Sequence, residues 1–324
     1  MSSPDALPRL LGDIGGTNAR FAWQDGAGAP LRDIQTLKVA EHASLAEAMR
    51  RYLQGLNRAA PPWCAIGVAT PITADAVRLT NSHWSFSISA VRRELAFERF
   101  VVINDFTALA LALPDLTPSE RRQVGGGTPV PDAAIALLGP GTGLGVSGLL
   151  PGRESGSWMP LQGEGGHVTL AATNEREAGV LQIIRERHGH ASAERAVSGM
   201  GLEAVHAALG VLEAAVDSTT LSAAEITAAA LDGSDERCVE AVALFCSFLG
   251  NVAGNLALTL GALGGVYIGG GIVPRLGEAF DRSPFRERFE AKGRFREYLA
   301  RIPVFVIDAS VSPALLGAAR ALAA

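Results

Sequence analysis

Six apolar runs of strand length recur along the chain, and segments with helical spacing lie between several of them. This alternation constrains the fold most, because strands that alternate with helices are typical of an α/β architecture with largely buried central strands. A length of 324 residues exceeds what one compact core usually holds, so we expect two domains or one split fold. The expected helices cover residues 44–56, 106–113, 174–188 and 236–260, and the expected strands lie in LLGDIGG, WCAIGVAT, RFVVIND, AIALLGPG, GGVYIGGG and IPVFVID.

Two of these runs share a longer pattern. LLGDIGGTNARFAW at residues 10–23 and LLGPGTGLGVSGLL at residues 137–150 both read as an apolar strand, a glycine-rich turn and a second strand. The repeat suggests two related halves that each open on a hairpin, with a boundary in the polar, proline- and glycine-rich stretch 114–131. Chance similarity between two short segments is the alternative.

The turns of both hairpins, and a third turn at residues 269–271, are rich in glycine. Glycine permits positive φ angles and lets backbone amides approach a ligand, so successive amides can bind polyphosphate. No Walker A motif occurs, and the first loop continues as a strand instead of opening a helix. Asp13, at the start of the first loop, is placed to reach a Mg²⁺ ion through water. The alternative for this loop is a tight hairpin that binds no ligand. The predicted nucleotide-binding residues are Gly12, Asp13, Ile14, Gly15, Gly16, Thr17, Gly141, Thr142, Gly143, Gly270 and Gly271.

The strand RFVVIN ends at Asn104 and Asp105, and a helix is expected to follow. Ligand sites in open α/β sheets lie at the carboxyl ends of strands, where this pair falls. A carboxylate there can accept a proton from a hydroxyl, and an amide beside it can bind neighbouring hydroxyls. The alternative is that Asp105 is only the N-cap of the following helix.

Glu164 and His167 lie three residues apart across a Gly-Gly turn, so both side chains can face one pocket. A carboxylate and an imidazole suit hydroxyl recognition better than metal binding, because no third ligand is spaced nearby. Glu194 follows Ser192, a possible N-cap, and a purely structural role at a helix N-terminus is its alternative.

Composition favours a small ligand over a macromolecule. The formal net charge is −5 with both signs interspersed, which argues against nucleic acid or an anionic membrane as a partner. The three cysteines, Cys64, Cys238 and Cys246, lack metal spacing, and free thiols in a cytoplasmic protein explain them better than disulfides or a zinc site. No secretory signal is visible. Residues 241–274 carry no charge, but Asn251, Asn255 and the final glycines favour a buried helix and strand over a membrane span.

Seven motifs together resemble the bacterial glucokinase family of the hexokinase and actin-like ATPase superfamily. They are GDIGGTNAR, INDFTALALA, GPGTGLGV, GEGGHV, SAERAVSG, GGVYIGGGIVPR and KGRFREY, and they run across nearly the whole chain. The cysteine-rich zinc motif usual in the broader repressor and sugar-kinase (ROK) family is missing.

The resemblance implies an α/β fold of the two-domain, actin-like (ribonuclease H-like) ATPase type with a ligand cleft between the domains. It implies a small domain at 1–114, completed by a C-terminal helix at about 306–324, and a large domain at 115–305. ATP would bind the first two loops, with the adenine near the third, and homodimers would be the usual assembly. Asp105 matches the family's catalytic base, and the residues that match sugar ligands are Asn104, Glu164, His167, Glu194 and, less strongly, Asn81.

The expected reaction is transfer of the γ-phosphoryl group of Mg-ATP to the 6-hydroxyl of glucose. A kinase for mannose, fructose or N-acetylmannosamine, a non-catalytic sugar sensor and an actin- or chaperone-like ATPase are the alternatives. The chain departs from the family pattern in ASVSPALLG near the C-terminus and in ATPIT at residues 69–73. We expect neither departure to touch the site residues.

Overall fold

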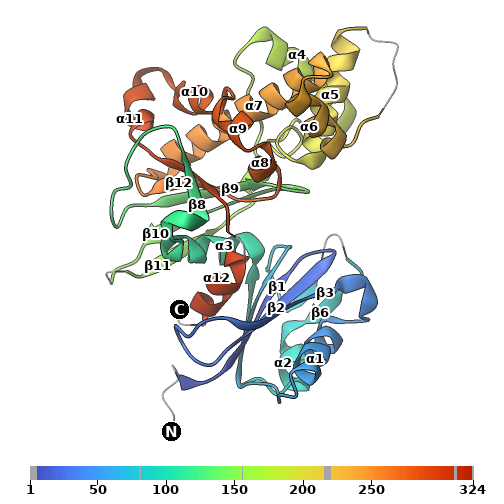
Figure 1. The fold of residues 1–324 in the computed structure, drawn as a ribbon, viewed down its shortest axis with the longest axis vertical. Helices are drawn as coiled ribbons and strands as arrows, with labels where there is room; N and C mark the ends of the chain where they lie inside the picture. Colours follow the sequence, from blue (N-terminus) through green and yellow to red (C-terminus); the bar gives the residue numbers. More distant parts are fainter. Residues whose placement is uncertain (1–5, 80–81, 155, 215–219, 310–311, 323–324) are drawn as a thin grey trace. The chain divides into compact units, whose positions relative to one another are not determined.

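The computed structural model describes residues 6–79, 82–154, 156–214, 220–309 and 312–322. The chain divides into two compact units. The first comprises Met1–Thr117 and Ala309–Ala324, and the second comprises Pro118–Asp308. The division falls inside the stretch 114–131. Each unit has a mixed sheet covered by helices, as the alternating pattern predicts (Figure 1).

The sheet of the first unit has five strands, in which β1, β4 and β7 run parallel and β2 and β3 are antiparallel to their neighbours. Its order is β3 (Arg32–Lys38), β2 (Asn18–Gln24), β1 (Arg9–Ile14), β4 (Trp63–Val68) and β7 (Arg99–Asn104), and a separate pair consists of β5 (Ala76–Arg78) and β6 (Ser85–Ser87).

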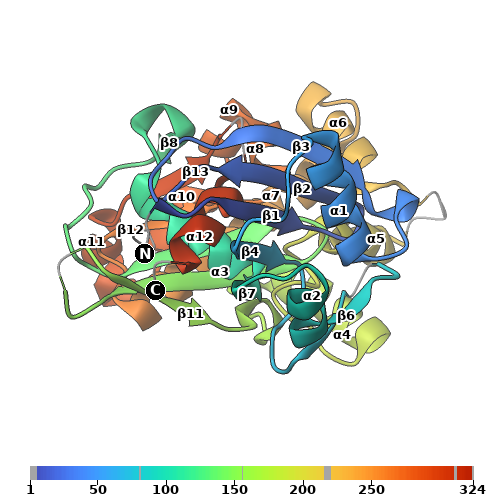
Figure 2. The same cartoon turned by 90° about the horizontal axis from the view of Figure 1, so that it is seen from below.

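Helices cover both faces of this sheet. Leu10 and Ile14 of β1 pack in one core with α1 (Leu45–Gly55) and α2 (Ile88–Glu94). Leu11, which points to the opposite face, packs against Leu315 of α12 (Pro313–Ala321), and α3 (Asp105–Ala112) lies beside α12. The alternation of side chains along β1 thus contributes apolar residues to two cores, one on each face of the sheet. Figure 2 shows the five strands side by side, from β3 to β7.

The sheet of the second unit has six strands. Strands β9, β12 and β13 run parallel, and β8, β10 and β11 are antiparallel to their neighbours. The order is β11 (Trp158–Gln162), β10 (Leu144–Pro151), β9 (Ile135–Pro140), β12 (Gly265–Ile268), β13 (Val304–Ile307) and β8 (Arg121–Val124). The sequence stretch expected to be only a boundary therefore contains β8, which the polar residues Arg121 to Gln123 conceal.

The longest helix of the second unit is the apolar α7 (Glu236–Leu260), which packs on β9 and β12. The helices that pack against α7 are α5 (Gly199–Leu212), α6 (Ala223–Asp232), α10 (Phe285–Glu290) and α11 (Arg296–Ala300). The unit also contains α4 (Glu175–His188), α8 (Ile272–Leu276) and α9 (Glu278–Asp281).

Helix α7 is long and apolar enough to cross a membrane, but 72 % of its most apolar window is buried inside the protein. A Cβ atom at Gly250 or Gly254 would lie 2.3 Å from the carbonyl of Phe285 or 2.5 Å from that of Phe289. The small residues in this helix therefore let α10 pack closely against it. The predicted interpretation as a buried core helix is confirmed.

The first sheet and five strands of the second share one topology, which confirms the predicted repeat. Strands β1, β2, β3, β4 and β7 correspond to β9, β10, β11, β12 and β13, and β8 is an additional strand at one edge of the second sheet. The hairpins β1–β2 and β9–β10 are the two glycine-rich segments that the sequence pairs.

Candidate active site

Two carboxylates lie at the carboxyl ends of parallel strands in the first unit. Asp13 of β1 is in register with Gly67 of β4, and Asn104, the last residue of β7, is in register with Val68. Gly67 lets α3 approach, because a Cβ atom there would lie 3.3 Å from the Cα of Asp105 and 3.0 Å from the Cβ of Ala108. The strands thus place Asp105 beside the end of β4 and within electrostatic reach of Asp13.

Asn104, not Asp105, is the N-cap of α3. The Asn104 Oδ1 atom accepts hydrogen bonds from the amides of Phe106 at 2.9 Å and Thr107 at 3.2 Å. Asp105 is the first helical residue, and its Oδ1 atom accepts from Phe106 N at 2.9 Å and from Asn104 Nδ2 at 3.0 Å. The alternative that Asp105 is only the N-cap of this helix is therefore wrong, since the side chain of Asn104 is the cap.

Asp105 has an unusual proton affinity. Burial, followed by the negative charge of Asp13, raises the pKa of Asp105 from its ordinary value of 3.8 to about 7. The hydrogen bonds from Phe106 and Asn104 act in the opposite direction but are weaker. A carboxyl group with this pKa exchanges a proton readily near neutral pH.

Asp13 is held by two neighbours that both bind its Oδ2 atom. Arg20 Nη1 lies 3.1 Å away, and Ser312 Oγ donates a hydrogen bond at 2.7 Å. Ser312 belongs to one segment that departs from the family pattern, and Thr70 of the other accepts from Asn104 Nδ2 at 3.4 Å. The expectation that these departures leave the site residues untouched is therefore wrong. Both contacts join residues that lie far apart in the sequence, so local patterns could not show them.

The first glycine loop is not shaped by positive φ angles. Gly12, Gly15 and Gly16 are absent from the glycines with positive φ. Gly12 is needed for packing, since a Cβ atom there would lie 2.6 Å from Ile66 Cγ2. The amide of Gly15 donates to the carbonyl of Asn18 at 2.9 Å and closes the turn. The loop is thus a tight hairpin, in which Ile14 ends β1 and Thr17 precedes β2.

The second glycine loop is partly open. A Cβ atom at Gly141 would meet nothing within 4 Å, and φ at Gly141 is not positive. The protein itself therefore gives no reason for glycine at this position, as expected where a ligand approaches the backbone. Gly143 differs, because a Cβ atom there would lie 2.4 Å from Glu194 Oε2. Thr142 lies between them at the tip of the turn.

The third turn lies against the second loop. Gly270 has φ +79°, and a Cβ atom there would lie 2.3 Å from the carbonyl oxygen of Pro140. The amide of Gly269 donates to Leu138 O at 2.9 Å. Gly271 resembles Gly141 in having open space where a Cβ atom would be. The second unit thus brings together two of the three predicted glycine turns.

Glu164, His167 and Glu194 form one cluster in the second unit. His167 Nε2 lies 4.0 Å from Glu164 Oε2, and His167 Nδ1 lies 4.0 Å from Glu194 Oε1. The Glu194 side chain is 23 % exposed, and its Oε2 atom accepts from the amide of Leu144 at 2.9 Å. Glu194 therefore links this cluster to the second glycine loop.

Two details of the sequence interpretation change. Ser192 does not begin a helix: its Oγ atom accepts from Arg195 N at 3.3 Å in a turn, and Ser198 caps α5 instead. Asn81 lies outside the described residues. Sequence reasoning also missed Gly67, Arg20 and Ser312. The glycine inside the apolar run WCAIGVAT was a signal for Gly67, whereas nothing in the sequence pointed to Ser312.

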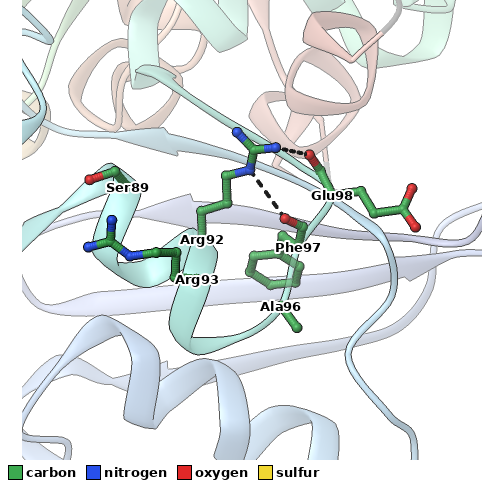
Figure 3. Close-up of a pocket in the computed structure, with 6 residues that line it drawn as sticks. All are labelled: Ser89, Arg92, Arg93, Ala96, Phe97 and Glu98. Carbon is green, nitrogen blue, oxygen red and sulfur yellow. Dashed lines mark hydrogen bonds between the residues drawn. The ribbon is translucent and has the colours of Figure 1, made fainter.

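A pocket of about 430 Å³ also occurs in the first unit, away from these residues. It is lined by Ser89, Arg92, Arg93, Ala96, Phe97 and Glu98 (Figure 3). Arg92 Nε donates to the carbonyl of Phe97 at 3.2 Å. This pocket lies before the start of β7, whereas Asn104 ends that strand, so it is not part of the carboxylate site.

Comparisons with known proteins identify the family of this chain. The glucokinase family model matches residues 10–324. A glucokinase of Aromatoleum aromaticum is 57 % identical over 98 % of this chain and 95 % of its own length, and one of Chromobacterium violaceum is 54 % identical over 99 % and 90 %. The crystal structure of glucokinase from an Antarctic psychrotroph has 37 % identity and a TM-score of 0.88, with 98 % of both chains covered. The chain therefore belongs to the glucokinase family, and its activity is that of an ATP-dependent hexose kinase.

Proposed function

We propose that Asp105 is the general base of a glucokinase that transfers the γ-phosphoryl group of Mg-ATP to the 6-hydroxyl of D-glucose. The observation that carries this assignment is the raised pKa, about 7, of a largely buried carboxyl group at the carboxyl end of β7. In its ionised form this group accepts the proton of the attacking hydroxyl. General-base assistance of this kind is typically worth about 10²- to 10⁴-fold.

The remaining acceleration comes from positioning and electrostatic stabilisation, because the transition state of phosphoryl transfer is loose. The glycine turns would supply backbone amides to the phosphates, and the open space at Gly141 and Gly271 supports this role. Thr17 and Thr142 add hydroxyl donors in the two hairpin loops.

Mg²⁺ would be held through water by Asp13. Arg20 and Ser312 bind Oδ2 of Asp13, and this existing charge pairing fits an outer role better than direct ligation. When bound, the metal ion neutralises charge that develops on the phosphates.

The proposed sugar ligands are Asn104, Glu164, His167 and Glu194, with Asn81 retained from the family resemblance. The cluster around His167 offers two carboxylates and one imidazole, and these groups accept and donate the hydrogen bonds that ring hydroxyls need. In Asn104 the Oδ1 atom caps α3, and Nδ2 donates to Asp105 Oδ1 at 3.0 Å and to Thr70 O at 3.4 Å. A hydrogen bond from Nδ2 to the sugar would therefore replace the longer contact with Thr70.

ADP release from purified protein with Mg-ATP, measured with and without glucose, tests this function. A large glucose-dependent rate is expected. The same rate without sugar would indicate an ATPase, and a higher kcat/KM for mannose, fructose or N-acetylmannosamine than for glucose would indicate another hexose kinase. No turnover with any sugar would indicate a sugar sensor.

The setting proposed for this enzyme is the cytoplasm, where it would supply glucose 6-phosphate to glycolysis as a homodimer. The homodimer and the cytoplasmic setting are carried over from the glucokinase family, to which bacterial relatives at 57 % and 54 % identity assign the chain. Sedimentation analysis tests the assembly, and a monomer at micromolar concentration would contradict it.

A further inference from the structure

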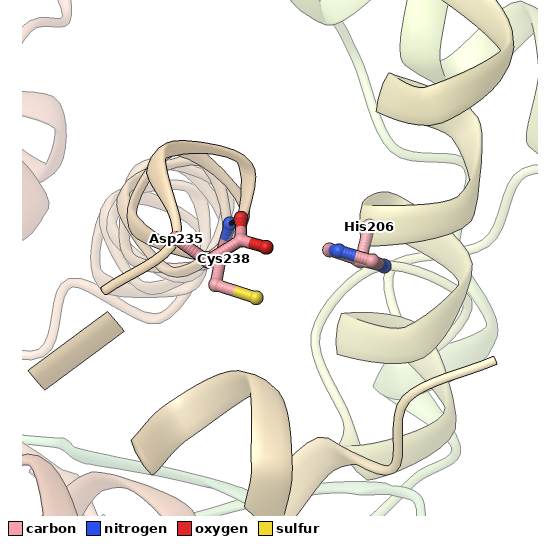
Figure 4. Close-up of side chains that lie close together, drawn as sticks. All are labelled: His206, Asp235 and Cys238. Atoms are coloured by element: carbon pink, nitrogen blue, oxygen red, sulfur yellow. Dashed lines mark hydrogen bonds between the residues drawn. The ribbon is translucent and has the colours of Figure 1, made fainter. Parts of the chain in front are cut away.

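A second cluster of polar side chains lies in the second unit, between α5 and the start of α7. It consists of His206, Asp235 and Cys238, whose potential ligand atoms all lie within 4.8 Å of one another. Figure 4 shows the edge of the His206 ring turned toward the carboxylate of Asp235 and the sulfur of Cys238. His206 lies 29 positions before Asp235 and 32 before Cys238, which is why the sequence shows no metal spacing.

His206 is the member of this cluster that needs an explanation. It is only 7 % exposed, and its buried Nε2 atom has no hydrogen-bond partner within the part of the chain that the structure describes. Leaving a buried polar atom unpaired costs free energy, so such atoms usually have a bound partner. The neighbouring donors are a thiol and a carboxylate, which together with imidazole are the ligands that zinc prefers.

We propose that His206, Asp235 and Cys238 bind one Zn²⁺ ion, with water as the fourth ligand. Zinc bonds of about 2.0–2.3 Å place the ligands of a tetrahedral site roughly 3.3–3.8 Å apart. Atoms already within 4.8 Å reach that spacing through small side-chain rotations. A thiolate disfavours Mg²⁺ and Ca²⁺, which prefer oxygen ligands.

The charges around the cluster are compatible with a divalent cation. Asp235 and an ionised Cys238 offset the two positive charges of the metal. Cys238 lies in the first turn of α7, where burial, followed by the charge of Asp235, raises the pKa of its thiol to about 11. A thiol that coordinates a metal ion loses its proton, so the thiolate would form when the cation binds. Arg237 is paired with Glu213 through a 2.8 Å contact, so its charge is largely compensated.

The ion would connect α5 to the N-terminus of α7. Asp235 is the N-cap of α7, and its Oδ1 atom accepts from the amide of Cys238 at 2.9 Å. All three ligands belong to the second unit, and none is a predicted catalytic or sugar-binding residue. The proposed role is therefore stabilisation, not catalysis.

The test uses full-length, tag-free protein that has been stripped of metal with a chelator and then exposed to Zn²⁺ or Co²⁺. Equilibrium dialysis with elemental analysis should find one zinc per chain. The Co²⁺ form should show an intense thiolate-to-cobalt absorption band, which Cys238→Ser should abolish and the control Cys246→Ser, on the same helix, should retain.

Asp235→Asn provides a second variant that keeps an N-cap acceptor and therefore the fold. It should bind zinc at least about tenfold more weakly and should lose most of the zinc-dependent rise in Tm. Absence of zinc binding to the unsubstituted chain, or an unchanged cobalt band in Cys238→Ser, would overturn the proposal.

Discussion

The hairpins β1–β2 and β9–β10 occupy the same place in their sheets but differ in charge. In the repeat that pairs residues 10–23 with 137–150, Asp13 of β1 corresponds to Pro140 of β9. Asp105 lies near the first hairpin. The carboxylate near the second hairpin is Glu194, which comes from another segment and binds the amide of Leu144.

This difference in charge suggests different roles for two hairpins of the same topology. In the proposal both hairpins supply backbone amides to the phosphates. The pair Asp13 and Asp105 belongs to the first unit, where burial and the charge of Asp13 raise the pKa of Asp105 to about 7. In the second unit the charged groups serve hydrogen bonding instead. The proposal therefore assigns proton transfer to the first unit and phosphate and sugar recognition largely to the second.

The largest effect is expected from Asp105→Asn. This variant removes the base and keeps the hydrogen-bond acceptor for Phe106, so kcat should fall about 10²- to 10⁴-fold while KM for glucose changes little. Steady-state assays of ADP release measure both values. Asp25→Asn, which changes an exposed carboxylate in the same unit, is the control and should retain full activity. A near-normal kcat in Asp105→Asn would contradict the assignment of proton transfer to the first unit.

The same substitution should stabilise the protein at neutral pH. Because the pKa of Asp105 is raised on folding, the folded state loses stability as the pH rises from about 4 to about 7. The free energy of unfolding of Asp105→Asn should exceed that of the unsubstituted chain by on the order of 4 kcal/mol at pH 8, and the gain should vanish near pH 4. Denaturant unfolding at both pH values measures it, and an equal gain at both would contradict the raised pKa.

Glu194→Gln tests the role of charge in the second unit. Glutamine can still accept from Leu144 N, so the fold should persist, but a charge-assisted hydrogen bond to a sugar hydroxyl is lost. We expect KM for glucose to rise about 10- to 100-fold. Glu203→Gln is a matched control, because Glu203 also accepts from a backbone amide, that of Ala223. If both variants behave alike, Glu194 has only a structural role.

Gly141→Ala tests whether the second hairpin approaches the nucleotide. Its added methyl group meets no protein atom, so Tm should not fall, whereas KM for ATP should rise roughly tenfold, or about 1.4 kcal/mol. Gly143→Ala should instead lower Tm, since it displaces Glu194. Gly55→Ala, another site with open space, controls for the substitution itself. An unchanged KM for ATP in Gly141→Ala would place the phosphates elsewhere.

The smallest expected effect is a pH shift in Asp13→Asn. Removing the negative charge of Asp13 should lower the pKa of Asp105, so the acidic limb of kcat/KM should move to lower pH. Ser312→Ala removes one hydrogen bond to Asp13 and no charge, so it should move the limb much less. A shift to higher pH in Asp13→Asn would contradict the electrostatic explanation.

The sequence predicted what local patterns determine. Apolar runs located the central strands, and the 25-residue α7 was delimited at both ends. The helix expected from residue 174 begins there, since Asn174 caps α4 through the amide of Glu177. The hairpin repeat also emerged from sequence alone. These features depend on neighbours within a few residues, which explains why they are readable.

The details of the site depend on contacts between distant segments, and these the sequence could not give. Gly12 is glycine because of Ile66, and Ser312 reaches Asp13 from almost 300 residues away. The sequence left Asp105 as a possible N-cap, but α3 already begins at Asp105, and Asn104 before it is the N-cap. The pKa of Asp105 follows from burial, which no motif reports.

The most direct test of the base assignment is the pH dependence of the chemical step, measured by rapid-quench mixing of enzyme, Mg-ATP and glucose. The rate of phosphoryl transfer by the unsubstituted chain should rise through one ionisation near pH 7, and Asp105→Asn should show a slow rate without that ionisation. An identical pH profile in both proteins would show that another group takes the proton.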